Sequence, residues 1–351
     1  MRVADNASIA PLTTLRLGGN AARLVTAERE VAVVDVVREI DSRREPLLVL
    51  GGGSNIVVSD AGFPGTVLRI GTHGRTTVTE GDRLHMTVQA GERWDLFVES
   101  VVDEGLAGVE CLAGIPGLVG AVPMQNVGAY GQDVSETIVR LRAYDRELRR
   151  IVELDRAECG FAYRSSAFRG KERHVILDVT FALERTRESR PIRYAELARA
   201  LGVPEGESAP LATVRTTVVE LRRKKGMVLD TSDLDTTSAG SFFTNPILSA
   251  AALAVLRDRS QGEGSVPAFP EPDGRFKVSA AWLIEHAGFP RGFVGAGGRV
   301  AVSSKHALAL VNRGGATTEE LIALARRIRD GVRARFGVAL ENEPVFVGVQ
   351  L

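Results

Sequence analysis

Three short clusters in this sequence carry side chains that could take part in chemistry. Residues 163–168, Tyr-Arg-Ser-Ser-Ala-Phe, place the guanidinium of Arg164 between an aromatic ring and two hydroxyls. Ser241 follows a glycine in a predicted tight turn, and Glu343 lies just before a predicted terminal strand. A guanidinium can hold a carboxylate or a phosphate, and hydroxyl and carboxyl groups can transfer protons. Each residue also has a structural reading, as a surface ion pair, a turn residue or a solvated strand end, so none of them identifies a site by itself.

Two glycine-rich segments predict where a nucleotide would bind. Residues 114–131, GIPGLVGAVPMQNVGAYG, combine glycines with two prolines, and residues 51–55, GGGSN, directly follow the apolar run 46–50. Glycines let the backbone turn sharply and bring its amide donors close to phosphate oxygens. Neither segment is followed by the Lys-Ser or Lys-Thr of a Walker loop, and neither has the dinucleotide GxGxxG spacing. An irregular glycine-rich crossover loop remains the alternative for the longer segment.

Hydrophobic periodicity predicts three α+β units that would carry these segments. The first is a small βαββ unit with strands at 22–26, 46–50 and 65–70 and a helix at 28–40. The second, larger unit contains the longer glycine segment; its predicted strands are 84–88, 138–144, 150–154 and 174–184, and its predicted helices are 94–102, 191–201 and 211–225. After a polar boundary at 230–238, the third unit has predicted helices at 249–257, 279–287 and 317–336 and predicted strands at 308–311 and 344–349.

The composition favours a small-molecule ligand over nucleic acid or a membrane surface. The 351-residue chain has 44 basic and 44 acidic residues, so it has no field of one sign, and its aromatic content of 5% is low for base stacking. Cys111 and Cys159 have no ligand-like spacing to each other or to the five histidines, which predicts two reduced thiols and neither a disulfide framework nor a metal site. No apolar leader and no apolar run of the ~18 residues that cross a bilayer is recognised. We therefore expect a cytoplasmic protein.

Seven motifs, taken in their order along the chain, resemble those of one enzyme family. They are TLRLGGNA, LVLGGGSNIVVSD, LAGIPGLVGAVPMQNVGAYG, FAYRSSAF, GSFFTNP, KVSAAWLIEHAG and LENEPVFVG, and they extend from Thr14 to Gly348. In this order they resemble the UDP-N-acetylenolpyruvoylglucosamine reductases (MurB), flavoenzymes of peptidoglycan precursor synthesis. The segment that carries Tyr194 resembles the insertion of the family's first type.

The resemblance implies an α+β fold with three parts. A vanillyl-alcohol-oxidase-type (PCMH-type) FAD-binding domain would consist of two α+β subdomains, 1–78 and 79–228. A smaller α+β substrate-binding domain would comprise 229–337, and the terminal strand in 338–351 would return to the subdomain 79–228.

The resemblance also assigns residues to a site. Arg164, Ser241 and Glu343 match the family's three catalytic positions. Four residues match positions that hold the substrate: Tyr163, Tyr194, Lys225 and Asn245. The residues matched to FAD binding come from the two glycine segments: Gly51, Gly52, Gly53, Ser54, Asn55, Gly114, Ile115, Pro116, Gly117, Gly120, Gln125, Asn126, Gly128, Ala129, Tyr130 and Gly131. In the terminal motif Asn342 stands where the family commonly has proline, so Glu341 remains an alternative to Glu343.

The implied reaction uses non-covalently bound FAD and NADPH. NADPH reduces the FAD, and the reduced flavin gives a hydride to the β-carbon of UDP-N-acetylglucosamine enolpyruvate, which yields UDP-N-acetylmuramate. Ser241 would donate the proton, and Arg164 and Glu343 would stabilise the enediolate. Lys225 would meet the diphosphate, whereas Arg222 and Arg223 are expected to act only as cations at a helix end. The implied partners are the UDP-sugar and NADPH, and the chain is expected to be a monomer without a metal.

Two other functions fit parts of this pattern. A flavin-dependent oxidase of a small alcohol or amine would use the same fold and would be recognised by rapid oxygen consumption. A non-catalytic flavin- or UDP-sugar-binding regulator would bind its ligand without turnover. The regulator leaves the combination of Arg164, Ser241 and Glu343 unexplained.

Overall fold

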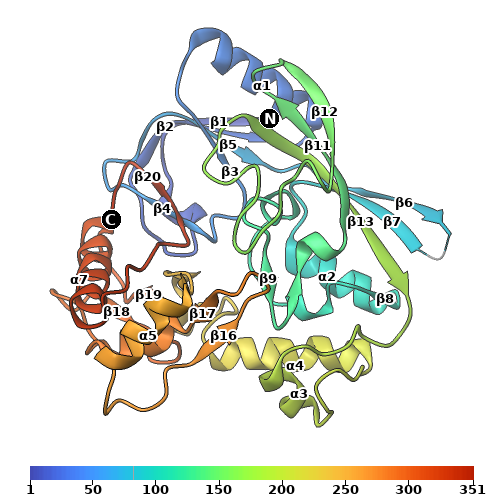
Figure 1. Cartoon of the computed structure of the whole chain (residues 1–351). Coiled ribbons are helices and arrows are strands. Elements are labelled where there is room, and N and C mark those ends of the chain that lie inside the picture. Colours follow the sequence, from blue (N-terminus) through green and yellow to red (C-terminus); the bar gives the residue numbers. More distant parts are fainter. Residues whose placement is uncertain (82) are drawn as a thin grey trace. The chain divides into compact units, whose positions relative to one another are not determined.

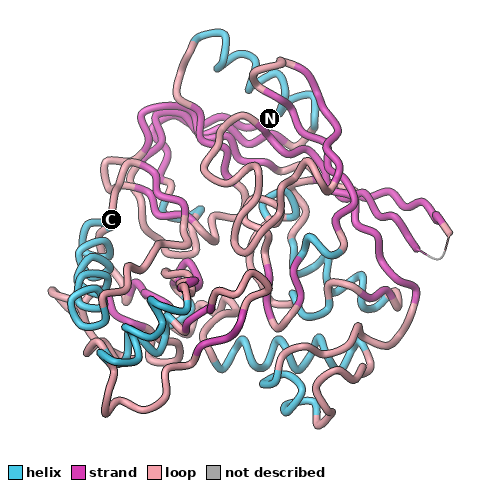
Figure 2. The backbone as a smooth tube through the Cα atoms, viewed as in Figure 1, coloured by secondary structure: helices cyan, strands magenta, loops and turns pink. Residues whose placement is uncertain are grey.

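The computed structural model describes residues 1–81 and 83–351, which form two compact units. The first unit contains residues 1–7, 21–53 and 63–228, and the second contains residues 8–20, 54–62 and 229–351. The N-terminal part of the chain therefore alternates between the two units. Figure 1 labels the helices and strands, and Figure 2 colours the backbone by secondary structure. Among the described residues, no helix is long and apolar enough to cross a membrane.

The first unit contains two main sheets with helices packed against them. In order along the chain its elements are β1 (Arg2–Ser8), β2 (Asn20–Ala27), α1 (Glu30–Arg43), β3 (Leu47–Leu50), β5 (Phe63–Ile70), β6 (Arg75–Glu80), β7 (Arg83–Gln89), α2 (Trp94–Asp103), β8 (Leu106–Ala107), β9 (Gly128–Ala129), β10 (Gln132–Asp133), β11 (Ile138–Asp145), β12 (Arg150–Asp155), β13 (His174–Arg185), α3 (Ala195–Leu201) and α4 (Leu211–Lys224). One sheet has the order β1-β2-β5-β3, and the other has the order β12-β11-β13-β7-β6 with β8 beside β13. The glycine segment 51–55 directly follows β3, and the segment 114–131 follows β8 and a short 3-10 helix.

The core of the first unit fixes the start of the longer glycine segment. Trp94, Phe97 and Phe181 are buried and pack with ring centroids 5.0 to 5.9 Å apart. The indole Nε1 of Trp94 donates to the carbonyl oxygen of Leu112 at 3.0 Å, which satisfies the polar atom of a buried aromatic residue. Because Leu112 lies two residues before Gly114, this contact ties the glycine segment to α2.

The second unit is built from short strands and three helices. Its elements are β4 (Ile56–Val58), β14 (Ser238–Ser241), β15 (Ile247–Leu248), α5 (Ala250–Arg259), β16 (Ala268–Pro270), β17 (Phe276–Val278), α6 (Ala280–His286), β18 (Val300–Val302), β19 (Ala309–Asn312), α7 (Thr318–Phe336) and β20 (Val345–Val347). Helix α7 begins with a capping box between Thr317 and Glu320 and ends at Gly337 in a left-handed conformation. Its apolar face supplies the largest share of a core that also contains Leu15 and Val57.

The terminal strand differs from the sequence-based expectation. It does not return to residues 79–228: β20 pairs in parallel with β4, with Val345 opposite Ile56 and Val347 opposite Val58. All three residues of β4 are buried, so its pairing groups need a partner away from water. The sequence did not reveal β4, because it is a three-residue strand between a glycine turn and a polar loop.

Candidate active site

The structure brings the two glycine segments of the first unit into contact. A Cβ atom on Gly52 would lie 2.6 Å from the Cα atom of Gly117, and a Cβ atom on Gly51 would lie 3.3 Å from that of Ala121. Within the described residues, the amides of Gly51, Gly52 and Gly117 donate no hydrogen bond to the chain. They are therefore available to a ligand. Strand β4 follows the GGGSN turn. The turn is therefore not continued by the N-terminus of a helix, and the backbone amides that can bind a phosphate belong to the turn itself.

The predicted GGGSN turn is divided between the two units. Ser54 and Asn55 belong to the second unit. There the Nδ2 of Asn55 donates to the carbonyl oxygen of Glu343 at 3.4 Å, and the carbonyl oxygen of Asn55 accepts from the amide of Val345 at 3.0 Å. Asn55, which was predicted to bind the cofactor, thus also holds the segment that carries the predicted catalytic glutamate.

Arg164 lies beside the longer glycine segment. It is the second central residue of a tight turn closed by mutual backbone hydrogen bonds between Ala162 and Ser165, and its φ of 49° lies in the left-handed region. Its Nη2 donates to the carbonyl oxygen of Gly128 at 2.7 Å, and its guanidinium carbon lies 5.4 Å from the centroid of the Tyr163 ring. The side chain is only 20% exposed. The turn and the carbonyl contact therefore hold a largely buried cation at this segment.

Two further hydrogen bonds fasten the turn to the glycine segment. The Nδ2 of Asn126 donates to the carbonyl oxygen of Ala162 at 3.1 Å, and its Oδ1 accepts from the amide of Ser135 at 3.1 Å. The Oγ of Ser166 donates to the carbonyl oxygen of Met124 at 2.6 Å. Asn126 was predicted to bind the cofactor, but both polar atoms of its side chain position neighbouring segments.

A cluster of aromatic and charged side chains joins Tyr130 to two predicted substrate residues. The Tyr130 and Tyr194 rings meet edge to face at 5.4 Å, and the Nζ of Lys225 lies 5.5 Å from the Tyr130 ring centroid. Burial raises the pKa of Tyr130 to about 12 and also raises the pKa of Tyr194, so both phenols remain neutral donors at neutral pH. Lys225 already forms an ion pair, because its Nζ lies 2.5 Å from the carboxylate of Glu196. A diphosphate would have to compete with this carboxylate.

The structure adds Arg222, whose place in the sequence predicts only a cation at a helix end. Its Nη2 donates to the carbonyl oxygen of Met227 at 3.0 Å, while its enclosed Nε has no acceptor within the described residues. A Cβ atom on Gly114 would lie 3.4 Å from this Nε. Burial lowers the pKa of Arg222 to about 10, so the group stays charged at neutral pH. The helical register of α4, which exposes Arg223 and encloses Arg222, was the signal that could have indicated it.

In the second unit, the sequence positions Ser241 at the end of a bulged strand. Ser241 lies opposite Ala309 of β19, and the register shifts between Ser238 and Ser241. Gly240 provides a φ of 73° within this irregularity, a value that glycine adopts readily. The hydroxyl of Thr14, from the first motif, donates to the carbonyl oxygen of Ser238 at 2.6 Å and anchors the start of the strand. The Ser241 hydroxyl makes no hydrogen bond within the described residues of its own unit.

The terminal motif pairs with the chain directly after Ser241. The amide of Glu343 donates to the carbonyl oxygen of Phe242 at 2.9 Å, and the amide of Thr244 donates to the carbonyl oxygen of Glu341 at 3.0 Å. Glu343 therefore lies beside the residue that follows Ser241, whereas Glu341 lies further along the pair. Glu343 is partly buried and Glu341 is exposed. This arrangement favours Glu343 over Glu341 as the partner of Ser241.

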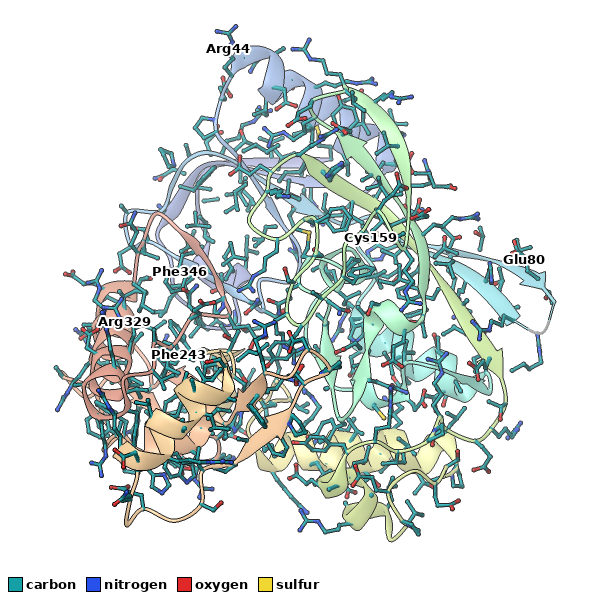
Figure 3. All side chains as sticks on the ribbon, viewed as in Figure 1. Arg44, Glu80, Cys159, Phe243, Arg329 and Phe346 are labelled. Atoms are coloured by element: carbon teal, nitrogen blue, oxygen red, sulfur yellow. The ribbon has the colours of Figure 1, made fainter. Side chains whose placement is uncertain are left out.

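Aromatic packing and a helix start account for the rest of the GSFFTNP motif. Phe242 and Phe243 are buried, with ring centroids 5.2 Å apart, and Phe242 also lies 5.9 Å from Phe346 of β20; Figure 3 labels Phe243 and Phe346. The Oδ1 of Asn245 accepts from the amide of Ala280 at 2.9 Å, at the first residue of α6. The predicted substrate residue Asn245 thus has one of its two polar side-chain atoms engaged in the fold.

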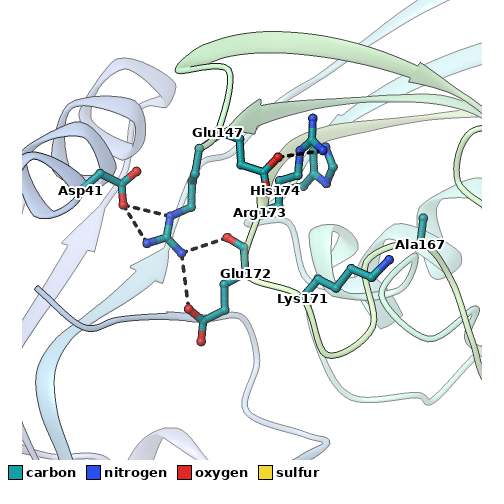
Figure 4. A pocket seen from close by; sticks show the side chains of 8 residues that line it. Asp41, Glu147, Ala167, Lys171, Glu172, Arg173 and His174 are labelled. Carbon is teal, nitrogen blue, oxygen red and sulfur yellow. Dashed lines mark hydrogen bonds and ion pairs between the residues drawn. The ribbon is translucent and has the colours of Figure 1, made fainter. Parts of the chain in front are cut away.

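A separate cavity of the first unit, of about 760 Å³, lies between α1 and the turn after β11 (Figure 4). Its charged lining residues are largely paired: Arg146 with Asp41 at 2.7 Å, and Arg173 with Asp145 at 2.7 Å. Hydrogen bonding from Arg173 lowers the pKa of Asp145 to about 2. None of the residues predicted for catalysis, cofactor or substrate lines this cavity, so it is not the candidate site.

Comparison with known proteins identifies the family. A family model described as "UDP-N-acetylenolpyruvoylglucosamine reductase, C-terminal domain" matches residues 232–347, and one described as "FAD binding domain" matches residues 21–154. The UDP-N-acetylenolpyruvoylglucosamine reductase of Thermobifida fusca is 55% identical over 353 residues, which cover 99% of each chain. The chain belongs to the UDP-N-acetylenolpyruvoylglucosamine reductase family. The Streptomyces avermitilis member is 53% identical over 352 residues, which cover 99% of this chain and 95% of that one.

A solved member of the family confirms the fold. The crystal structure of UDP-N-acetylenolpyruvylglucosamine reductase (MurB) from Thermus caldophilus aligns with a TM-score of 0.68 at 23% identity and covers 99% of each chain. The α+β fold class with an FAD-binding domain, predicted from the motifs, is confirmed. The chain is thus an FAD-containing oxidoreductase of this reductase family.

The first unit fits FAD on its own geometry. The backbones of Gly52 and Gly117 approach so closely that side chains would fill the space between them, and the amides there are unpaired within the described residues. The enclosed Nε of Arg222 lies against Gly114 without an acceptor in the described chain. Free amide donors and an enclosed cation are what a dinucleotide with a pyrophosphate requires.

The Gly52→Ala variant is expected to bind FAD at least ~10-fold more weakly, because the new Cβ would press on backbone atoms that cannot rotate away. The Cβ would lie 2.6 Å from the Cα of Gly117. Titration of the apoprotein with FAD, followed by flavin fluorescence, measures the Kd. Gly71→Ala is the matched control, since its nearest neighbours are at 3.4 Å or more. Equal FAD affinity in Gly52→Ala and the wild type would contradict the assignment of the turn.

Proposed function

We propose that this chain reduces UDP-N-acetylglucosamine enolpyruvate to UDP-N-acetylmuramate for peptidoglycan precursor synthesis, with FAD bound non-covalently and NADPH as the reductant. Relatives that are 55% and 53% identical over nearly the whole chain are named for this reductase activity. The observation that carries the proposal is the backbone pairing that sets Glu343 beside the residue after Ser241. On these neighbouring segments, a hydroxyl would donate the proton to a carbanion-like intermediate and a carboxyl group would stabilise that intermediate.

The cofactor would be held by the glycine segments 51–55 and 114–131. The chemistry that bound FAD supplies is hydride transfer, from NADPH and then to the β-carbon of the enolpyruvyl group. In this proposal the chain's own residues bind and orient the reactants and manage the charge and the proton that follow.

Arg164 would stabilise the negative charge that develops on the substrate carboxylate. A guanidinium presents a rigid fork of donors to two oxygens, and its effect is greatest where water is excluded. The side chain is 20% exposed, and its Nη2 is fixed on the carbonyl oxygen of Gly128. This orientation is therefore set before a substrate arrives.

Ser241 would donate the proton to the α-carbon of the enediolate. A serine hydroxyl is neutral at any working pH, so it can act without a tuned pKa when the intermediate is sufficiently basic. Its hydroxyl has no competing hydrogen bond within the described part of the second unit. Glu343 would assist in its acid form by donating a hydrogen bond to the enediolate.

Anaerobic stopped-flow absorbance at the flavin band tests the proposed function. NADPH should bleach the band, and subsequent addition of UDP-N-acetylglucosamine enolpyruvate should restore it. Bleaching without recovery would reject this substrate and favour the oxidase alternative, which oxygen consumption with small alcohols and amines would then examine. Failure of the protein to bind FAD would reject the flavoenzyme assignment altogether.

The Lys225→Ala variant should raise the substrate KM by ~10-fold or more and leave kcat within a few-fold of the wild-type value. Lys225 would contact the diphosphate equally in the ground state and the transition state, so its loss removes uniform binding. Steady-state kinetics with varied UDP-substrate and saturating NADPH give both constants. A KM within error of the wild-type value would contradict this role.

The ion pair of Lys225 with Glu196 offers a second test, in which the substrate KM should change in the opposite direction. Glu196 is an anion that the diphosphate would have to displace, since the two groups are 2.5 Å apart and only partly exposed. The Glu196→Gln variant should therefore lower the substrate KM by a few-fold, in line with the modest strength of such pairs. In the Lys225→Ala background the same change should have no effect.

A further inference from the structure

Two segments of the first unit that carry predicted cofactor and substrate residues run side by side. The rings of Tyr130 and Tyr194 meet at 5.4 Å, and a Cβ atom on Gly131 would lie 3.1 Å from the Cβ atom of Arg193. Next along the two segments, Gln132 and Arg190 do not bond each other within the described part of the chain, but both donate a hydrogen bond to a third residue, Glu110. The end of the longer glycine segment and the segment that leads to Tyr194 are therefore in direct contact at two positions, and Glu110 links them at a third.

Glu110 is a carboxylate with no exposed surface, in the 3-10 helix η2 (Glu110–Leu112). Its Oε2 accepts from the amide of Gly108 at 2.6 Å. Its Oε1 accepts from the Nε2 of Gln132 at 2.9 Å and from the amide of Arg190 at 3.1 Å. Burying a carboxylate is costly unless hydrogen bonds replace the lost water. Three donors from three separate parts of the chain perform this replacement.

These bonds join the two ends of the longer glycine segment. We call this junction, between residues 110–111 and Gln132, the neck. Glu110 and Cys111 precede residues 114–131, and Gln132 follows them. Gln132 makes two hydrogen bonds across the neck, because its Nε2 donates to Glu110 and its Oε1 accepts from the amide of Cys111 at 2.9 Å. The same carboxylate oxygen that receives Gln132 also receives the amide of Arg190, four residues before Tyr194.

We propose that Glu110 is a positioning residue that holds Tyr194 in register with the cofactor segment. It acts through Gln132 on the segment that ends at Tyr130 and Gly131, and through the amide of Arg190 on the segment that carries Tyr194. This inference rests on the proposed function, in which residues 114–131 would hold FAD, and on the resemblance that matches Tyr194 to a position that holds the UDP-sugar substrate.

The Glu110→Gln variant separates positioning from simple stability. Whichever way the new amide turns, its NH₂ group faces a donor, either the amide of Gly108 or those of Gln132 and Arg190, so the neck must open. We expect the Kd of FAD, followed by flavin fluorescence, and the Kd of UDP, measured by calorimetry on the FAD-loaded protein, each to rise by ~10-fold. The kcat at saturating substrate should stay within a few-fold of the wild-type value. The matched control is Glu188→Gln, which removes the same charge from an exposed residue close to Arg190.

The Gln132→Ala variant provides a milder and directional test. It loosens the cofactor side of the neck but leaves the bond from the amide of Arg190 to Glu110, so the Kd of FAD should rise while the Kd of UDP stays at the wild-type value.

Folded Glu110→Gln protein with wild-type values of both constants and only a lower Tm would overturn the inference. If Glu110→Gln does not fold, equal FAD affinity in Gln132→Ala and the wild type overturns it. Failure of the wild type itself to bind UDP would reject the proposed function and this inference with it, whereas wild-type binding that is unchanged in the variants rejects the inference alone.

Discussion

In the Ser241→Ala variant, reoxidation of the reduced flavin by the enolpyruvyl substrate is expected to slow by ~10²-fold to 10⁴-fold, the range that loss of a general acid usually causes. FAD binding and reduction by NADPH should remain at wild-type values, because Ser241 belongs to the second unit and the glycine segments 51–53 and 114–131 belong to the first. The predicted defect is thus confined to the step that needs a proton on the substrate.

Anaerobic stopped-flow spectroscopy distinguishes the two half-reactions in this variant. The bleaching rate with NADPH reports the first, and the recovery rate on addition of the UDP-substrate reports the second. Ser249→Ala is a suitable control, since it removes another serine hydroxyl of the same unit, the one that accepts the amide of Ala252 at the start of α5. It should lower stability by about 1 kcal/mol and leave both rates unchanged. Unchanged recovery in Ser241→Ala would remove Ser241 from the mechanism.

Much of the fold could be predicted from the sequence, because its long elements have strong periodic patterns. The predicted helix 317–336 is α7, and the predicted helix 211–225 is α4. The short strands were missed for physical reasons. β6, Arg75–Glu80, is exposed along its whole length, and β4 has only three residues, so neither produces a recognisable alternation of apolar and polar side chains.

The residues of the candidate site could be predicted from the sequence, whereas most of the contacts among them could not. Motif order led to Arg164, Ser241 and Glu343, but only the structure shows that the chain after Ser241 pairs with the terminal motif, about a hundred residues away in sequence. The sequence also could not show that the side chain of Asn126 is used to position the Arg164 turn. Such contacts depend on tertiary pairing. The type of a polar residue in a motif does not show whether its side chain binds a ligand or forms a hydrogen bond within the protein.

The enclosed groups Glu110 and Arg222 illustrate the same limit. Both are charged residues whose types alone predict exposure. Glu110 has no exposed surface, and the Nε of Arg222 is enclosed. Gly114 lies close to the Nε of Arg222, and hydrogen bonds from Gly108, Gln132 and Arg190 enclose the carboxylate of Glu110. Such burial arises from tertiary contacts, which the residue types alone do not reveal.

Arg164→Met should slow hydride transfer to the substrate by ~10²-fold to 10³-fold, the usual effect of losing one preorganised group that stabilises a developing anion. Reduction by NADPH should be little affected, because no substrate carboxylate is present in that step. Arg164→Lys should recover only part of the rate, since an ammonium keeps the charge but cannot present two parallel donors. The stopped-flow recovery rate at saturating UDP-substrate measures both variants.

A structural explanation for Arg164 must be tested separately, because this residue also shapes its turn. Its φ of 49° is unfavourable for most side chains, and its Nη2 fixes the carbonyl oxygen of Gly128. Asparagine tolerates this conformation, so Arg164→Asn preserves the turn while removing the guanidinium. If the turn alone mattered, Arg164→Asn would retain wild-type recovery and Arg164→Met would not. If the guanidinium stabilises the developing charge, both variants lose the recovery step to a similar extent, whatever their Tm values.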